Sequence, residues 1–225
     1  MAKLKAALIH ITISIFLLGI LYYIIAVIWY PKPFFSIASV IQPMKLLVMV
    51  DVIIGPMLTF IVYKKGKKSL MFDLTVIAIL QISALAYGIY TIEQGRPAII
   101  VYKNEKLHYV NTKFSKNKQV KDPNIHLKLF ARPQMGTLPN TGNLDIYSDY
   151  EDIKAVKDFK LEWLPHSLTT ENMKAQFKSK ADEIEALNNK YKDDKIVFFL
   201  LKNQMASYYV VFSTTQNKII DKLHF

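Results

Sequence analysis

One acidic residue interrupts an otherwise apolar stretch, and it is the first place in this sequence to look for chemistry. Asp51 lies in residues 46–63 (LLVMVDVIIGPMLTFIVY), about five positions, or roughly 8 Å, from the start of that stretch. The thirteen apolar residues favour membrane insertion by roughly 5 kcal/mol, and a central Asp costs about 2.5 to 3.5 kcal/mol. Such an acid must face other helices or a polar cavity. A functional role, protonation, and an internal hydrogen bond to a neighbour such as Gln81 all remain open.

Gly55 and Pro56 follow Asp51 by about one helical turn. We expect this pair to loosen or kink the helix and to free backbone carbonyls, because proline lacks the amide donor. Gly55, Pro56 and Gln81 therefore join Asp51 as candidate partner-binding residues.

The rest of the sequence shows no catalytic arrangement. Its histidines are isolated from metal-binding spacing, there is no glycine-rich phosphate loop, and adjacent acidic pairs are typical of solvated surface. The histidines are His10, His108, His126, His166 and His224. We expect no catalytic residue, no metal site, no cofactor and no enzyme activity.

The composition places Asp51 in a membrane domain. The chain has 225 residues, 52% of them hydrophobic, with a formal charge of +11, a mean hydropathy of +0.17 and no cysteine. The apolar excess falls in the first ninety residues or so, which we interpret as a domain over residues 1–92 with transmembrane helices at about 6–30, 46–63 and 70–90. The first of these is too long for the apolar core of a cleaved signal peptide, although residues 36–38 resemble a cleavage site.

Lysine placement predicts the orientation. Four lysines crowd the loop at residues 64–68, and Lys3 and Lys5 precede the first helix. Lysines resist crossing, so we expect both regions in the cytoplasm and residues 93–225 outside the cytoplasm. Aromatic residues near the segment ends (Tyr22, Tyr23, Trp29, Tyr30, Tyr63, Tyr87 and Tyr90) suit the headgroup boundary. Asp73 is better explained by the first turn of its helix and the nearby lysines.

Residues 93–225 predict an α+β domain with an antiparallel sheet. We expect a hairpin from residues 97–103 and 106–111, mostly loop over 113–143, and a short helix over 149–159. A longer helix should begin at Thr169 or Thr170 and run to about 191, with one apolar stripe packed on the sheet. A three-stranded meander should follow at 195–201, 207–213 and 218–224. The domain's 21 bases and 16 acids could favour anionic lipid headgroups, and nucleic acid is not expected outside the cytoplasm.

Residues 51–97 resemble the type IV pilin accessory proteins TfpY and TfpZ. The matching positions are Asp51, Gly55-Pro56, Leu58-Thr59, Asp73-Leu74, Gln81, Ala84-Leu85, Tyr87-Gly88 and Arg96-Pro97. The resemblance implies a bacterial inner-membrane accessory that is encoded with a particular pilin and is needed for normal assembly or extension of type IV pili. With the expected topology, residues 93–225 would then lie in the periplasm. Pilins wait in the inner membrane with one apolar helix inserted, usually with a glutamate near its start, and with a periplasmic head.

The leading hypothesis is therefore a pilin-specific chaperone or assembly modulator. Its expected partners are a type IV pilin subunit and membrane lipids, and the pilus assembly platform is a further candidate. The alternative is a membrane enzyme that modifies pilin or lipid with Asp51 in its site, for which the other helices offer little beyond Gln81 as a second polar group. A sensor ranks last, since this topology leaves only short tails in the cytoplasm for signal output.

Overall fold

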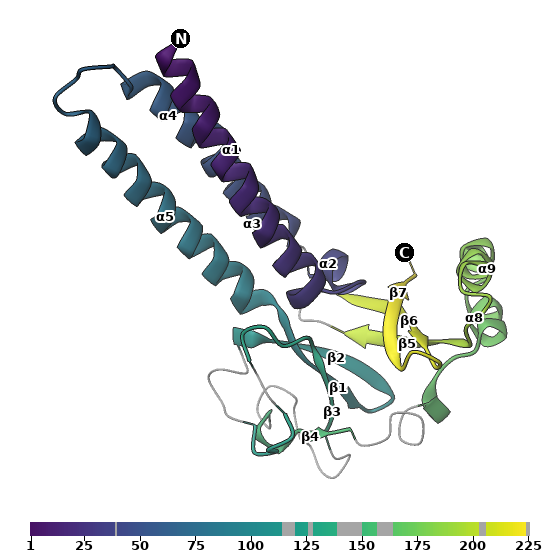
Figure 1. The fold of residues 1–225 in the computed structure, drawn as a ribbon. Helices are drawn as coiled ribbons and strands as arrows, with labels where there is room; N and C mark the ends of the chain where they lie inside the picture. Colours follow the sequence, from purple (N-terminus) through teal and green to yellow (C-terminus); the bar gives the residue numbers. More distant parts are fainter. Residues whose placement is uncertain are drawn as a thin grey trace.

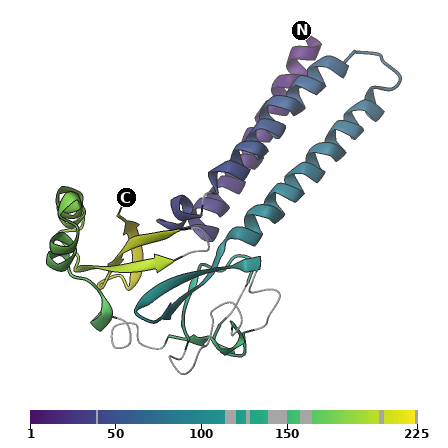
Figure 2. The ribbon, with the colours of Figure 1, turned by 180° about the vertical axis from the view of Figure 1, so that it is seen from behind.

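The structure is a computed structural model that describes residues 1–38, 40–113, 120–125, 128–138, 150–156, 164–202 and 206–223. A long helical bundle carries the N-terminus at its far end and a sheet domain at the other (Figures 1 and 2). Throughout, the sheet domain means the described residues from Arg96 onward.

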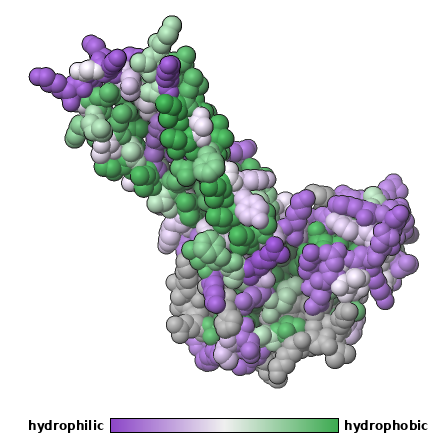
Figure 3. Space-filling model, viewed as in Figure 1, coloured by the Kyte–Doolittle hydropathy of each residue, from purple (hydrophilic) through white to green (hydrophobic). Residues whose placement is uncertain are grey.

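Among the described residues, three helical rods are long and apolar enough to cross a membrane, which is the number of such helices that the sequence predicted. The first combines α1 and a π-helical turn, η1, and the second passes through α3, a π-helical segment, η2, and α4. Their bounds are α1 (Ala2–Tyr23), η1 (Ile24–Trp29), α3 (Ile41–Val48), η2 (Met49–Ile54), α4 (Gly55–Val62) and, for the third rod, α5 (Leu70–Gly95). Figure 3 shows hydrophobic side chains over much of the visible face of the bundle, and hydrophilic ones at the far end of the bundle and on the sheet domain.

Proline and glycine interrupt the rods where the sequence indicates. The first rod ends at Trp29, just before Pro31 and Pro33. The π-helical turns of η2 stop immediately before Gly55 and Pro56, so the predicted loosening of the second helix is confirmed. The second rod begins at Ile41, five residues earlier than expected, and the third continues to Gly95.

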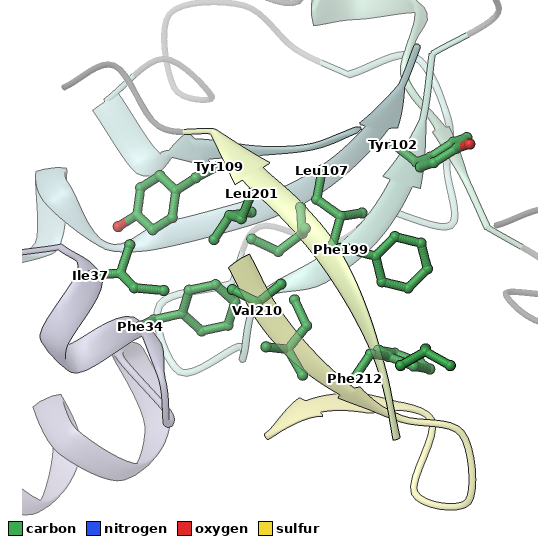
Figure 4. Packing of buried hydrophobic residues seen from close by; sticks show 12 residues of the cluster. Phe34, Ile37, Tyr102, Leu107, Tyr109, Phe199, Leu201, Val210 and Phe212 are labelled. Atoms are coloured by element: carbon green, nitrogen blue, oxygen red, sulfur yellow. The ribbon is translucent and has the colours of Figure 1, made fainter. Parts of the chain in front are cut away.

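The link between the first two rods forms part of the sheet domain's core. It contains a short helix, α2 (Phe34–Ile37), in which both Phe34 and Ile37 are buried. The Phe34 ring lies 6.1 Å from that of Tyr109, centroid to centroid, and both residues belong to the cluster drawn in Figure 4. The bundle and the sheet therefore share a hydrophobic core.

In the described part of the chain, the sheet has seven strands in the order β4-β3-β1-β2-β5-β6-β7. The hairpin β1–β2 and the meander β5–β6–β7 are antiparallel and were both predicted. The parallel pairing of β2 with β5 joins the hairpin to the meander. On the other side of the hairpin, β3 pairs in parallel with β1, and β4 pairs antiparallel with β3. The strands are β1 (Pro97–Lys103), β2 (Lys106–Asn111), β3 (Gln134–Thr137), β4 (Lys154–Ala155), β5 (Ile196–Lys202), β6 (Ser207–Ser213) and β7 (Lys218–Lys222). Asn104 and Glu105 form the hairpin turn with positive φ, as a two-residue connection requires.

Two local predictions for this domain were wrong, and one strand was not predicted. The unpredicted strand is β3, which lies within the region expected to be mostly loop. The short helix expected over 149–159 is a 3₁₀ turn, η3 (Tyr150–Asp152), followed by β4, in its described part. The long helix is broken into α8 (Thr170–Gln176), a 3₁₀ turn, η5 (Lys178–Lys180), and α9 (Ala181–Lys190).

The helix start and the apolar stripe were predicted correctly. The Thr169 side chain accepts a hydrogen bond from the amide of Asn172, which caps α8. The chain leaves helical geometry at Phe177, with φ −121° and ψ 68°. The stripe nevertheless stays on one side, because Met173, Ile184 and Leu187 pack together with residues of β5 and β6.

Candidate membrane-embedded site

The second rod lies between the other two. Helix α1 packs against α4 and η2, whereas α5 packs against α3 and α4. Two hollows, of about 160 Å³ and about 520 Å³, lie between α1 and α5, and both are lined by His10, Ile13, Ala78 and Gln81. We call this lined space the groove. The larger hollow also reaches Ala2 and Lys5, so the groove extends toward the N-terminal end of the bundle.

Polar side chains from all three rods meet along the groove. Asp51 lines the smaller hollow with only 6% of its surface exposed. Its carboxylate accepts a hydrogen bond from the side chain of Gln81 and interacts electrostatically with His10. The Nδ1 atom of His10 and the Oγ1 atom of Thr59 share a hydrogen bond of 2.7 Å. The acid is therefore partnered inside the protein, as its cost in an apolar helix requires.

Gly55 makes the contact between the second rod and Gln81 possible. A Cβ atom built on Gly55 would lie 1.9 Å from the Nε2 atom of Gln81 and 2.6 Å from its Cδ atom. Pro56 is buried directly after it and has no amide hydrogen to donate to the preceding turn. Asp51 belongs to the π-helical segment that precedes this pair, and such segments are frequent at functional sites.

The structure thus brings Asp51, Gly55 and Gln81 together, with Pro56 beside them. It also adds His10, which the sequence analysis treated as isolated. The one available signal was that His10 is the sole residue of residues 6–30 whose side chain ordinarily gains a charge near neutral pH. That these residues bind a partner stays a prediction.

Two other sequence features have structural explanations. Asp73 pairs with Lys67 and lies 3.4 Å from the Ser69 hydroxyl at the start of α5, which confirms its structural interpretation. Gly88 allows α5 to approach α3, since a built Cβ would lie 2.3 Å from the Cδ2 atom of Leu47.

A buried junction holds the bundle to the sheet domain. The guanidinium of Arg96 pairs with Glu93 at 3.4 Å, donates to the carbonyls of Lys128 and Ala131, and lies 5.8 Å from the Trp29 ring. Tyr30 donates from its hydroxyl to a carbonyl of α5 at 2.6 Å. Both Trp29 and Tyr30 are buried inside the protein. They therefore hold the bundle to the sheet domain, whereas the sequence analysis expected them to face lipid headgroups.

Within the part of the chain that the structure describes, no cluster of histidine, aspartate and glutamate could hold a metal ion. The site's chemistry is that of a carboxylate, an imidazole, an amide and hydroxyl groups beside an apolar groove. These groups can exchange protons or hydrogen-bond a polar group that enters between the helices.

These features define a membrane-associated protein in which three apolar helices carry a mostly antiparallel sheet domain. Comparison with known proteins shows which family it represents. The chain is 31% identical over 105 residues to the fimbrial assembly proteins of serogroup I and of serogroups C1 and C2 from Dichelobacter nodosus. It is also 31% identical over 106 residues to the serogroup E1 protein of the same organism.

Each match covers 46% of this chain. The matched region spans 80% of the serogroup C1 and C2 protein, but only 41% and 40% of the serogroup I and E1 proteins. The chain belongs to the family of fimbrial assembly proteins. No protein-family model and no solved structure matches it.

Proposed function

We propose that this chain is an inner-membrane accessory of type IV pilus biogenesis, of the TfpY and TfpZ kind, and that it binds its pilin in the groove. It would act there as a pilin-specific chaperone or as a modulator of pilus assembly or extension. The observation that carries the proposal is the buried Asp51, hydrogen-bonded to Gln81 and placed beside His10 in a groove between two membrane-length helices.

The walls of the groove suit a helix as occupant. Ile9, Ile13 and Leu17 recur every four residues on α1, line the hollows, and are exposed, as is Ile82 on α5. Lipid tails are as apolar as these side chains, so helices associate in a membrane through close packing and interhelical hydrogen bonds. The polar groups of the groove offer such hydrogen bonds, which an acyl chain could not use.

The proposed orientation matches this occupant. With the lysine-rich loop at 64–68 in the cytoplasm, the sheet domain would lie in the periplasm beside the pilin head. Asp51 lies at the middle of the second rod, ten residues after Ile41 and eleven before Val62, so a glutamate of the pilin helix would have to reach the middle of the bundle to approach it. The two acids could share a proton in this low-dielectric site, or the pilin's amino terminus could supply the opposite charge.

His10 gives the enzyme alternative a specific basis. A carboxylate and an imidazole beside a hollow can serve as proton donor and acceptor, and the second ionisable group that the sequence analysis did not find is present. As an enzyme, the chain would modify pilin or lipid at the groove. Binding without modification remains the better-supported proposal, because the relatives are named as assembly proteins.

Replacement of Asp51 tests the proposal. Asp51→Asn keeps the shape of the side chain and removes its charge, and Asp73→Asn is the matched control because that acid is explained by Lys67 and Ser69. The proposal expects normal levels of Asp51→Asn protein but weakened crosslinking to the pilin and defective piliation, with neither change in Asp73→Asn. Intact crosslinking and piliation in both Asp51→Asn and Asp51→Ala would overturn it.

The same variants separate the enzyme alternative. An enzyme would lose a modification from pilin or lipid, visible by mass spectrometry, while Asp51→Asn still captured pilin. A reduced amount of inserted protein alone would assign Asp51 to folding.

A further inference from the structure

A loop of the sheet domain is held at the end of the helical bundle by hydrogen bonds to its backbone. The indole nitrogen of Trp29 donates to the carbonyl of Leu129 at 2.7 Å. The guanidinium of Arg96 donates to the carbonyls of Lys128 and Ala131, each at 2.9 Å. Trp29 ends the first rod and Arg96 directly follows the third, so these bonds fix the loop where both rods reach the sheet domain.

The backbone of this loop is fixed, but two of its apolar side chains are exposed. Leu129 is 52% exposed and Phe130 is 62% exposed. Among the described residues of the sheet domain, Leu129 and Phe130 are the only large hydrophobic residues that are exposed. The other exposed large hydrophobic residues of the described chain belong to the rods and their ends. In water, two adjacent apolar side chains of this size that remain exposed are unfavourable relative to burial.

Charged residues flank the apolar pair. Lys128 and Arg132 are exposed on either side of Leu129 and Phe130. Arg132 also lines a hollow of about 400 Å³ together with Lys32, three residues after Trp29, so a further cation lies beside the loop. An apolar tip between cations, at the level where membrane helices end, is complementary to an anionic bilayer surface.

We infer that residues 128–132 form a membrane-inserting loop. Leu129 and Phe130 enter the leaflet on the side of the sheet domain, and Lys128 and Arg132 contact phospholipid phosphates. The loop thereby adds a fourth attachment to the bilayer and limits tilting of the sheet domain against the bundle. This inference needs only that the rods span a membrane and does not depend on pilin binding.

Spin labelling of the full chain in nanodiscs tests the inference. The sequence has no cysteine, so Phe130→Cys and the control Lys154→Cys each give a single site for a nitroxide. Lys154 is exposed in β4, the edge strand of the sheet at the end away from the bundle (Figure 1). Accessibility to oxygen, which concentrates in lipid, is compared with accessibility to a water-soluble nickel chelate.

In bilayers of phosphatidylcholine with phosphatidylglycerol, the label at Phe130→Cys should show an oxygen-to-nickel ratio severalfold above that at Lys154→Cys. Adding Lys128→Gln and Arg132→Gln, or omitting phosphatidylglycerol, should lower the ratio at Phe130→Cys and leave Lys154→Cys unchanged. Equal ratios at the two positions would overturn the inference. Low accessibility of Phe130→Cys to both reagents would also overturn it, because that result indicates a protein contact instead of lipid.

Discussion

Replacing Gly55 with alanine should have the opposite effect to the usual one in a helix. In a helix interior, alanine is more favourable than glycine by about 1 kcal/mol. At Gly55 the added methyl carbon would lie 1.9 Å from the Nε2 atom of Gln81, which is much closer than atoms can approach. The Gln81 side chain must therefore withdraw, and Asp51 loses the hydrogen bond that it accepts from that side chain.

The expected magnitude follows from these opposing terms. A hydrogen bond between membrane helices contributes about 0.6 kcal/mol on average and up to about 1.7 kcal/mol, and an acceptor left unsatisfied costs a further 1 to 3 kcal/mol, roughly. After subtracting the alanine gain, we expect Gly55→Ala to destabilise the protein by roughly 0.6 to 3.7 kcal/mol. With Gln81→Ala already present, the clash and the bond are both absent, so Gly55→Ala should stabilise by up to about 1 kcal/mol. The coupling between the two positions is then roughly 1.6 to 4.7 kcal/mol.

Unfolding of the full chain in detergent micelles measures these differences across the double-mutant cycle. Gly19→Ala in α1 is the matched control, because a Cβ atom there meets nothing within 4 Å. It should be neutral or stabilising in either background. A Gly55→Ala protein as stable as Gly19→Ala, with no coupling to Gln81, would refute this account of how the second and third rods meet.

Three further predictions concern the junction, the sheet and the orientation. Arg96→Ala should destabilise the protein by about 3 to 5 kcal/mol in chemical unfolding, because it removes the buried guanidinium that pairs with Glu93 and donates to the carbonyls of Lys128 and Ala131. Arg96→Lys should not restore stability, since an ammonium cannot reproduce the guanidinium contacts, and full rescue by lysine would contradict this. Burial, and to a smaller extent the positive charge of Lys202, lowers the pKa of His108 to about 4. The folded state therefore resists protonation of His108 between about pH 6.5 and pH 4, where the unfolded state binds the proton. Because the side chain is partly exposed, we expect the free energy of unfolding to fall by only about 1 to 2 kcal/mol as the pH drops through this range. His108→Gln should remove that part of the pH dependence, and an unchanged profile would be contrary evidence. Alkaline phosphatase fused after residue 100 should be active and fused after Gly66 inactive, and the reverse pattern would overturn the proposed orientation.

Local sequence signals were sufficient for much of the fold. Runs of apolar residues gave the three rods, Asn104-Glu105 gave the hairpin turn, and Thr169 gave a helix start. Each of these features depends on residues that are neighbours along the chain. The loosened helix before Pro56 was predictable for the same reason, because a missing amide hydrogen acts one turn away.

The missed elements depend on distant parts of the chain. Strand β3 has only four residues and pairs in parallel with β1, whose residues lie about 35 positions earlier. Neither its length nor its composition indicates a strand without that neighbour. The break at Phe177 likewise keeps Met173 and Ile184 on the same core, which the helical period alone does not require.

Two residues of the candidate site, Asp51 and Gln81, could be predicted from the sequence, and a third, His10, could not. Asp51 was identified from its energetic cost, and Gln81 was the neighbour named for it, because both lie in clearly apolar helices. His10 could not be assigned to the site, since sequence does not say which faces of two helices oppose each other. Trp29 and Tyr30 were misassigned for a related reason, because an aromatic residue at a helix end can meet lipid or protein, and here it meets protein.

Site-specific photocrosslinking from α1 tests the central claim most directly. A photoreactive amino acid at Ile13, which lines the groove and is 53% exposed, is compared with one at Ile15, which is 56% exposed and lines neither hollow. The two positions share residue type, helix and depth, so they differ chiefly in the direction they face. If the groove receives the pilin helix, the pilin should be captured from position 13 and much less from position 15. Equal capture from both positions, or none from position 13 in cells that assemble pili normally, would contradict the claim.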